Sequence, residues 1–206
     1  MKKTIVILII IISNACAIAQ NPPVLRTLPA RIKLMQEGFN ANPGDYYKDL
    51  DNELDKYEGT WVYDDGNGTV FTLNLRKVEM FYTPGTNYRY TDKIIVTYKL
   101  IKNYELLVDN LSLPILPSFA NIPDEIGLKY GYYGLSVADN TIDGFITDLT
   151  LDIVRMSEIK YLPQPSGNPK IKFSIFSASA SRRKPKEFYV GKPHSILPNN
   201  VILTKI

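Results

Sequence analysis

The chain has 206 residues, with 24 lysines and arginines against 21 aspartates and glutamates, for a formal net charge of +3. This near balance does not provide the concentrated basic face that a protein needs to follow a phosphate backbone, so no nucleic-acid partner is expected. One cysteine leaves nothing to cross-link within the chain, so we expect a single domain stabilised by a sizeable buried core.

The first 19 residues have the parts of a secretory signal peptide: two lysines, an apolar run and an A-x-A site that ends at Ala19. The apolar run is too short to span a bilayer. Cleavage after Ala19 would give a mature chain that begins at Gln20. We therefore expect export to the periplasm or the extracellular space.

Cys16 provides an alternative fate for the same segment. Ala15 precedes this cysteine, as in lipoprotein sites, but Ser13 stands three positions upstream, where an aliphatic residue is usual. Lipidation of Cys16 would make the protein an outer-membrane lipoprotein. We expect contact with a membrane through this anchor only if Cys16 is lipidated, and the sequence identifies no protein partner.

Residues 20–44 contain four prolines and little sustained hydrophobic periodicity, which indicates an N-terminal leader or a partly draped arm. The folded domain is therefore expected to span residues 45–206. Residues 45–54 (DYYKDLDNEL) are polar and compatible with a helix, so the sequence predicts a short N-terminal helix before the first strand.

Residues 57–63 are predicted to form the first strand, which carries the only tryptophan of the chain. Because side chains alternate along a strand, Tyr57, Gly59 and Trp61 share one face. Glycine is a poor strand residue, so Gly59 indicates that the indole or a neighbouring strand approaches the backbone closely. We expect Tyr57 and Trp61 to face the core, with a structural role for Trp61.

A helical turn that leads into K-Y-x-G-x-W-x-Y resembles the first signature of the lipocalins and related calycin barrels. The motif is carried by Lys56, Tyr57, Gly59, Trp61 and Tyr63. The resemblance implies a closed barrel in which the tryptophan closes one end, usually under an arginine from a late strand. Here Lys205 stands where that arginine is expected, and Thr147-Asp148-Leu149 replaces the family's Thr-Asp-Tyr-like turn. The whole chain also resembles secreted bacterial lipocalin-like families without an assigned function.

Residues 64–68 (DDGNG) invite two interpretations, a calcium loop and a hairpin turn. A calcium loop of the helix-loop-helix kind needs further oxygen ligands at fixed offsets and a closing glutamate, and neither follows. Asp-Gly and Asn-Gly between two strand patterns are strong hairpin signals. The sequence therefore predicts a turn here and no metal site.

The second predicted strand changes the parity of its apolar face. Phe71, Leu73 and Leu75 alternate first, and after residues 76–77 the even positions Val78, Met80 and Tyr82 take over. A slip of one residue reverses every later side chain, so a bulge or a sharp coil is required. Strongly bent strands of this kind are typical of closed barrels.

Further strand patterns follow at short intervals, and none is part of a repeated β-α-β spacing. They cover residues 94–100, 104–108, 130–137, 142–146, 149–154, 171–175 and 201–206. Together these patterns predict an all-β fold, an antiparallel lipocalin-like β-barrel of about eight to ten strands with a short N-terminal helix.

The connection at residues 110–127 is unusually apolar for a loop. It carries three prolines, and between Leu111 and Ile122 it carries six large apolar residues: Leu111, Leu113, Ile115, Leu116, Phe119 and Ile122. Loops normally run over the surface, so these side chains must be covered by something. Two alternatives remain open: the connection packs on the barrel as ordinary core, or it forms a functional lid or a membrane-touching loop.

The sequence offers no convincing catalytic constellation. His194 is the only histidine and follows a proline in a predicted loop, and no G-x-S-x-G elbow is present. One histidine without further cysteines cannot supply the usual zinc ligands. Carboxylate pairs such as Asp143 and Asp148 are ordinary solubilising residues at strand ends unless geometry brings them together. We therefore expect no enzyme, no cofactor and no metal.

Fourteen tyrosines and eight phenylalanines are the remaining functional signal. Aromatic residues fill small barrels, and they also line cavities that hold one small ligand. The leading hypothesis is an exported, non-catalytic protein that binds or carries a small apolar molecule. Its predicted ligand-binding residues are Tyr98, Tyr104, Leu116, Phe119 and Tyr132. The alternative is a structural or envelope-interaction module with a filled barrel and no ligand.

Overall fold

A computed structural model describes residues 25–27, 43–84, 89–118, 129–135, 140–182 and 184–206, and every structural statement below concerns these residues. The predicted signal peptide, Cys16 and most of the predicted leader therefore lie outside the described residues. Within the described part, no helix has the length and the hydrophobicity needed to cross a bilayer.

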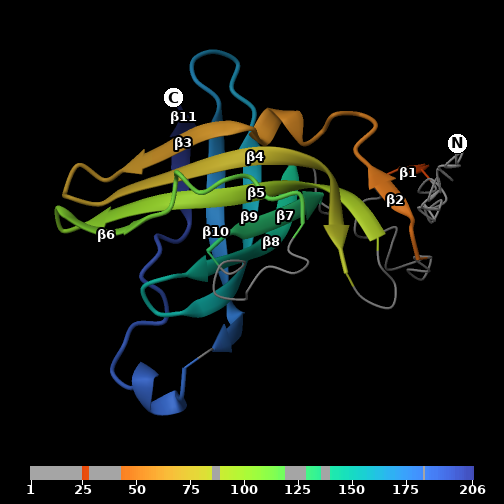
Figure 1. The fold of residues 1–206 in the computed structure, drawn as a ribbon. Helices are drawn as coiled ribbons and strands as arrows, with labels where there is room; N and C mark the ends of the chain where they lie inside the picture. The colour runs from red at the N-terminus through yellow and green to blue at the C-terminus, as the bar shows by residue number, and fades with distance from the viewer. Residues whose placement is uncertain (1–24, 28–42, 85–88, 119–128, 136–139, 183) are drawn as a thin grey trace, which may run out of the picture.

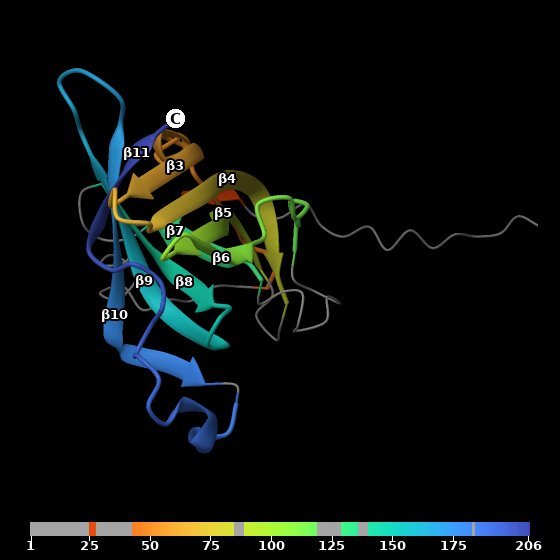
Figure 2. The same ribbon diagram turned by 90° about the vertical axis from the view of Figure 1, so that its left-hand side faces the viewer.

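The fold is all-β, with 56% of residues in strands, and eight antiparallel strands close into a barrel. This confirms the predicted fold class. Each strand of the ring pairs with its neighbours in an up-and-down order, and β5 pairs with β7 to close the ring (Figures 1 and 2). The ring consists of β3 (Gly59–Asp64), β4 (Val70–Thr83), β5 (Arg89–Lys102), β7 (Gly131–Leu135), β8 (Thr141–Asp148), β9 (Ile153–Leu162), β10 (Lys170–Arg182) and β11 (Val201–Lys205).

Three further strands lie outside the ring. β6 (Glu105–Asp109) forms a hairpin with the end of β5, and β2 (Tyr46–Lys48) adds in parallel to the beginning of β5. β1 (Leu25–Thr27), which belongs to the predicted leader, pairs in parallel with β2. Two 3-10 helices complete the described elements, η1 (Asp55–Tyr57) and η2 (Lys186–Tyr189).

The helix predicted at residues 45–54 is wrong, because the segment forms β2, a turn and then η1. The Tyr46 hydroxyl donates to the buried carboxylate of Asp92 at 2.7 Å, which holds β2 against the sheet. The carboxylate of Asp49 accepts from the backbone N–H groups of Glu53 and Leu54, and Asn52 has a left-handed φ of 55°. Short polar side chains that accept hydrogen bonds from nearby N–H groups compete with the hydrogen bonds of a helix. This competition explains why the segment forms a turn instead of a helix.

The bulge predicted in the second strand is confirmed, but it lies at residues 79–80 rather than at 76–77. The β4–β5 register shifts between Val78 and Phe81, and Met80 has a φ of 51°. Val78 and Phe81 consequently share one face, which belongs to a cluster on the outer wall of the barrel. The apolar residues before the parity change, Leu73 and Leu75, face the interior. Val78, which follows it, faces the outer wall, so the parity change reports the beginning of a second apolar face.

The strand predicted at residues 149–154 is also wrong, because residues 149–152 form the turn between β8 and β9. The Leu151 N–H donates to the backbone oxygen of Asp148, and Asp152 has a φ of 53°. Leu151 is nevertheless buried, and Leu149 packs against the main core. The alternating apolar residues therefore reflect a turn that folds onto the core.

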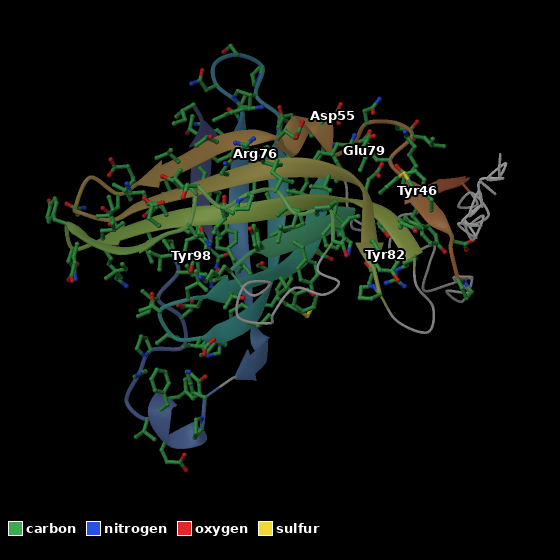
Figure 3. The ribbon with its side chains drawn as sticks, viewed as in Figure 1. Tyr46, Asp55, Arg76, Glu79, Tyr82 and Tyr98 are labelled. Atoms are coloured by element: carbon green, nitrogen blue, oxygen red, sulfur yellow. The ribbon has the colours of Figure 1, made fainter. Side chains whose placement is uncertain are left out.

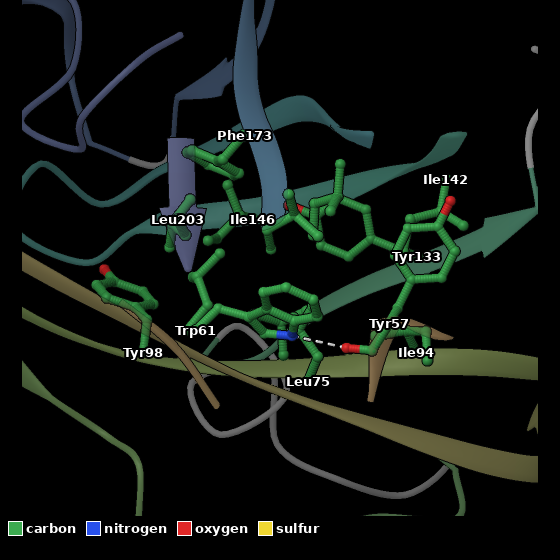
Figure 4. Close-up of a cluster of buried hydrophobic side chains, with 14 of the residues drawn as sticks. Tyr57, Trp61, Leu75, Ile94, Tyr98, Tyr133, Ile142, Ile146, Phe173 and Leu203 are labelled. Carbon is green, nitrogen blue, oxygen red and sulfur yellow. Dashed lines mark hydrogen bonds between the residues drawn. The ribbon is translucent and has the colours of Figure 1, made fainter. Parts of the chain in front are cut away.

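Trp61 lies fully buried at one end of the barrel interior, as expected. Its Nε1–H donates to the backbone oxygen of Tyr57 at 2.8 Å (Figure 4). The ammonium of Lys205, from the last strand, lies 5.4 Å from the indole centroid. Gly59 has a φ of 125°, and a Cβ there would lie 2.6 Å from Cε of Lys205. The close approach predicted at Gly59 is therefore made by the side chain of Lys205.

Two glycines permit the strands to approach closely where the ring closes. Gly131 pairs with Val96 across the β5–β7 seam, and a Cβ on Gly131 would lie 3.0 Å from a carbonyl oxygen of β8. Gly144 pairs with Tyr133, and a Cβ on Gly144 would lie 2.0 Å from the carbonyl oxygen of Tyr132. Any side chain at Gly144 would therefore push β7 and β8 apart.

The first prediction concerns Trp61. Trp61→Ala should lower the free energy of unfolding by about 3 to 5 kcal/mol, the range for deleting a large buried aromatic side chain. Urea denaturation followed by far-ultraviolet circular dichroism measures this loss. Ile206→Ala, at an exposed side chain, serves as the control and should stay within about 0.5 kcal/mol of wild type. Native tryptophan emission typical of an exposed indole would contradict the assignment.

The second prediction concerns ring closure. Gly144→Ala should destabilise the protein by about 3 kcal/mol or more, because overpacking here meets backbone atoms that cannot move independently. Gly134→Ala in β7 is the matched control, since a Cβ at Gly134 would meet nothing within 4 Å. Thermal or urea unfolding of both variants measures the difference, and equal stabilities would contradict the close approach of β7 and β8.

Candidate functional site

The five residues predicted to bind a ligand do not converge on one described site. Tyr98 points into the barrel, whereas Tyr104 is 81% exposed at the turn between β5 and β6. Leu116 and Tyr132 lie together in the cluster on the outer wall. Phe119 lies outside the described residues. The structure therefore separates an interior position, a hairpin tip and an outer-wall position.

The barrel interior is filled with side chains that pack against one another. Phe71 lies between Phe173 and Tyr98, at ring-centroid distances of 5.5 and 5.8 Å, and Tyr161 meets Trp61 edge-on at 6.5 Å. The fully buried members come from every strand of the ring, and they include Leu73, Val96, Ile159 and Ile171. Figure 4 labels further members, among them Trp61, Ile94, Tyr133, Ile142 and Leu203. A small barrel of eight strands has an interior just wide enough for such a filling.

Two hydroxyl groups inside the barrel, those of Tyr98 and Tyr133, have partners within the protein, whereas the buried Tyr57 hydroxyl has none among the described residues. The Tyr98 hydroxyl donates to the backbone oxygen of Thr147 at 3.1 Å and accepts from the Leu149 N–H at 3.0 Å. Tyr133 and Ser157 share a short hydroxyl–hydroxyl hydrogen bond. Burial raises the pKa of both tyrosines, so they are neutral hydrogen-bonding groups at physiological pH. Their bonds fix β5, β7, β8 and β9 relative to one another.

The outer-wall cluster is a second apolar core, formed where the connection after β6 packs on the outside of β4, β5 and β7. Its buried members are Val78, Phe81, Ile95 and Tyr130, and its half-buried members are Leu113, Leu116 and Tyr132. A cavity of about 10 Å³ lies beside it, with walls from Ile95, Thr97, Pro114 and Tyr130 among others. This volume corresponds to about one water molecule.

Hydrogen bonds fasten this connection to the wall at both ends. The Asn110 side chain accepts from the Tyr98 N–H and donates to the backbone oxygen of Lys129. The Tyr130 hydroxyl donates to the backbone oxygen of Pro114 at 2.8 Å, and Ser118 donates to the backbone oxygen of Tyr82 at 3.0 Å, beside the bent end of β4 (Figure 3). For residues 110–118, the structure therefore supports the packed alternative.

Lys93 is the unusual titratable group of the outer wall. Its ammonium lies 4.9 Å from the centroid of Phe81 and 5.2 Å from that of Tyr132, with the Thr83 hydroxyl 3.5 Å away. Burial, followed by the nearby positive charge of Arg89, lowers the pKa of Lys93 to about 8. The two aromatic faces favour the charged form, but the loss of hydration outweighs them.

A polar network fastens the segment after η2 to the turn between β8 and β9. The buried carboxylate of Asp148 accepts from the Ser195 hydroxyl at 3.0 Å and from the Ile196 N–H at 2.7 Å. Arg155, buried on the inner face of β9, donates to Nε2 of His194 at 2.9 Å. Thus the Ser195 hydroxyl donates a hydrogen bond to a carboxylate, and His194 accepts a hydrogen bond from a guanidinium. Over the part of the chain that the structure describes, no group of acidic, histidine or cysteine side chains could hold a metal ion.

Sequence reasoning did not identify Lys93 or Arg155. Both lie in alternating strands, Lys93 on the outward parity of β5 and Arg155 on the inward parity of β9. The position of Arg155 among the inward-facing residues of a strand could have been recognised in the sequence. A buried charge is rarely left without partners, so such a position predicts a polar network. The environment of Lys93 could not be read in the same way, because Phe81 and Tyr132 come from distant positions in the chain.

The fold and these sites define a closed antiparallel β-barrel with a filled interior and a covered outer wall. The chain belongs to a family described as "Family of unknown function (DUF6705)", whose model matches residues 1–206. No curated protein and no solved structure matches the chain.

The third prediction concerns the half-buried charge of Lys93. A protonated Lys93 destabilises the folded state below pH 8, and this penalty disappears as the pH rises toward the ordinary lysine pKa of about 10.4. Lys93→Met should therefore be more stable than wild type near pH 7. The stability difference should shrink by about 1 to 2 kcal/mol between about pH 7 and 9.5.

Urea denaturation across this pH range measures the difference, and it stays below about pH 10, where tyrosines begin to ionise in the unfolded chain. Lys99→Met is the control on the same strand, because Lys99 is more exposed and pairs with Asp109 at 3.4 Å. A stability difference between wild type and Lys93→Met that does not change with pH would contradict the burial argument.

Proposed function

We propose that this protein is an exported, non-catalytic, lipocalin-like barrel that acts through its outer surface, as a structural or envelope-interaction module. The observation that carries this proposal is the filled interior. Phe71, Phe173 and Tyr98 occupy the middle of the barrel, and Trp61 occupies one end. Ligand pockets usually have about 300 to 1,000 Å³. A ligand of that size would have to displace these packed side chains.

The lipocalin-like part of the proposal is supported by the contact between Lys205 and Trp61. The resemblance of the first strand implied a tryptophan at one end of a barrel beneath a cation from a late strand. The Lys205 ammonium at 5.4 Å from the indole, from the last strand, fits this arrangement with lysine in place of arginine. The up-and-down order of the ring is compatible with the same relationship.

The non-catalytic part is supported by the partners of the only histidine and its neighbouring serine. A serine nucleophile needs a base within hydrogen-bonding reach. The Ser195 hydroxyl instead donates to Asp148, while His194 Nε2 accepts from Arg155. Export is supported by the signal-peptide pattern of residues 1–19, and lipidation of Cys16 stays the alternative route to the envelope.

Carriage of a small apolar molecule is the second candidate function. One observation favours it: Leu116 and Tyr132, two of the five predicted ligand-binding residues, lie in the same outer-wall cluster. A carrier of this kind would bind its ligand between the connection and the wall rather than in the interior. The cavity of about 10 Å³ there would have to enlarge by movement of the connection.

The fourth prediction tests the filled interior with benzene as the probe. Wild-type protein should show no saturable benzene binding, whereas Phe173→Ala should acquire it, because a dry apolar cavity left by a deleted ring binds benzene. The variant should also lose about 3 to 5 kcal/mol of stability. Calorimetric titration at a temperature where the variant is folded measures both affinities.

Phe176→Ala provides a matched control, since Phe176 lies on the same strand with its side chain exposed. It should neither bind benzene nor lose comparable stability. Leu203→Ala opens a smaller cavity in the same core if Phe173→Ala is too unstable. Stoichiometric uptake of benzene or of a fluorescent apolar probe by wild type would support the carrier instead.

A further inference from the structure

The segment from Lys184 to Lys192, here called the basic tip, projects from the barrel beyond the end of β10. It contains η2 and follows the last residue of β10, which still pairs with the beginning of β9. Figures 1 and 2 show this segment as the lowest part of the molecule, well away from β3 and β4. Neither the core nor the outer-wall cluster uses its side chains.

Positive charge is concentrated in and beside the basic tip. Residues 182–192 (RRKPKEFYVGK) hold five of the 24 basic residues and one of the 21 acidic residues, a net charge of +4. Because the whole chain carries +3, the other residues together carry −1. The described cations Lys184 and Lys192 stand at the two ends of the tip, on either side of η2.

Apolar side chains are exposed between these cations. Val190 is 77% exposed and Phe188 is 37% exposed, and the Phe188 ring meets the neighbouring Tyr189 ring edge-on at 5.1 Å. The ammonium of Lys192 lies 3.1 Å from the Phe188 ring centroid. A convex patch therefore combines an aromatic ring, an aliphatic side chain and flanking positive charge.

The basic tip is held in shape by the barrel. The Tyr189 hydroxyl accepts from the Lys184 N–H at 3.0 Å and donates to the backbone oxygen of Asp152 at 3.2 Å. Lys184 also forms an ion pair with the carboxylate of Asp152 at 3.4 Å. These bonds attach both sides of η2 to the turn between β8 and β9. The exposed residues thus form a preformed surface, which lowers the ordering cost of binding.

We propose that the basic tip docks the protein on an anionic phospholipid surface, with Val190 and Phe188 entering the interface and Lys184 and Lys192 facing the lipid phosphates. Basic residues flanking exposed aromatic and aliphatic side chains suit the charged headgroups and the apolar layer beneath them. A stable protein interface needs about 800 Å² on each partner. A short convex tip fits a bilayer surface better than an acidic protein of that footprint.

This inference is independent of whether the interior binds a ligand, and it differs from anchoring through Cys16. The test uses the chain without lipid, from Gln20 to Ile206, and vesicles of phosphatidylcholine and phosphatidylglycerol in equal parts. Vesicles of phosphatidylcholine alone are the lipid control. Co-sedimentation should show binding to the anionic vesicles that weakens as the salt concentration rises.

Two variants separate charge from apolar insertion. Lys192→Glu should weaken binding at least about fivefold, since each basic residue near such a surface contributes about fivefold. This variant leaves the ion pair between Lys184 and Asp152 in place. Val190→Ser should weaken binding severalfold without changing any charge. Lys129→Glu combined with Lys160→Glu makes a larger change in net charge at exposed lysines elsewhere and should bind as wild type does.

Native Trp61 emission, which reports the far core, should be unchanged in all three variants and verifies that they are folded. No binding of wild-type protein to anionic vesicles would overturn the proposal. An equal loss in the Lys129 and Lys160 pair would also overturn it, since only net charge would then matter. Binding of an acidic protein by the tip without binding to vesicles would assign the tip to a protein partner and likewise overturn it.

Discussion

The structure depends on the closure of the ring along one edge of β5. β7 meets this edge over only three register pairs, at Ile94, Ile95 and Val96, and β2 and β6 pair with the positions on either side. A closed ring leaves no free strand edge within it. The short β5–β7 pairing closes the ring. This pairing is possible because Gly131 and Gly144 let β5, β7 and β8 approach without a side chain between them.

Closure on a ring of eight strands sets the volume that the interior side chains must fill. In this chain, large aromatic residues fill it. The polar atoms of Trp61, Tyr98 and Tyr133 bond to backbone and hydroxyl partners, whereas the buried Tyr57 hydroxyl has no partner among the described residues. Buried polar groups that have partners make the packing specific. The aromatic richness of the sequence is therefore explained by filling, and it requires no ligand.

Much of the ring could be predicted from the sequence, because its signals are local. The alternation of Phe71, Leu73 and Leu75, the DDGNG turn and the glycine ahead of Trp61 each act within a few residues. The parity change after Leu75 is also visible in the chain, but it marks the change from the inner face to the outer wall and precedes the bulge, whose position depends on Asp92. That carboxylate, from the neighbouring strand, accepts the Met80 N–H at 3.0 Å and fixes the bulge at residues 79–80.

The errors arise where distant residues decide the local structure. Residues 45–54 are compatible with a helix, but Tyr46 bonds to Asp92 in β5 and the segment is drawn into the sheet. The same applies to the candidate site. Tyr98, Tyr104 and Tyr132 differ in exposure because they face the interior, the hairpin tip and the outer wall, and the wall is apolar only where residues 110–118 cover it.

The distribution of charge bears on the proposed surface function. Outside residues 182–192, 19 basic and 20 acidic residues nearly cancel, so the excess of positive charge lies in the projecting segment and gives the molecule an electrostatic dipole. Long-range attraction to an anionic surface would turn the basic tip toward that surface before contact. Salt screens this attraction beyond about 8 Å at physiological ionic strength, so orientation acts only close to the surface. Once the tip touches the surface, the exposed Val190 and Phe188 provide the short-range apolar contact that charge alone does not supply.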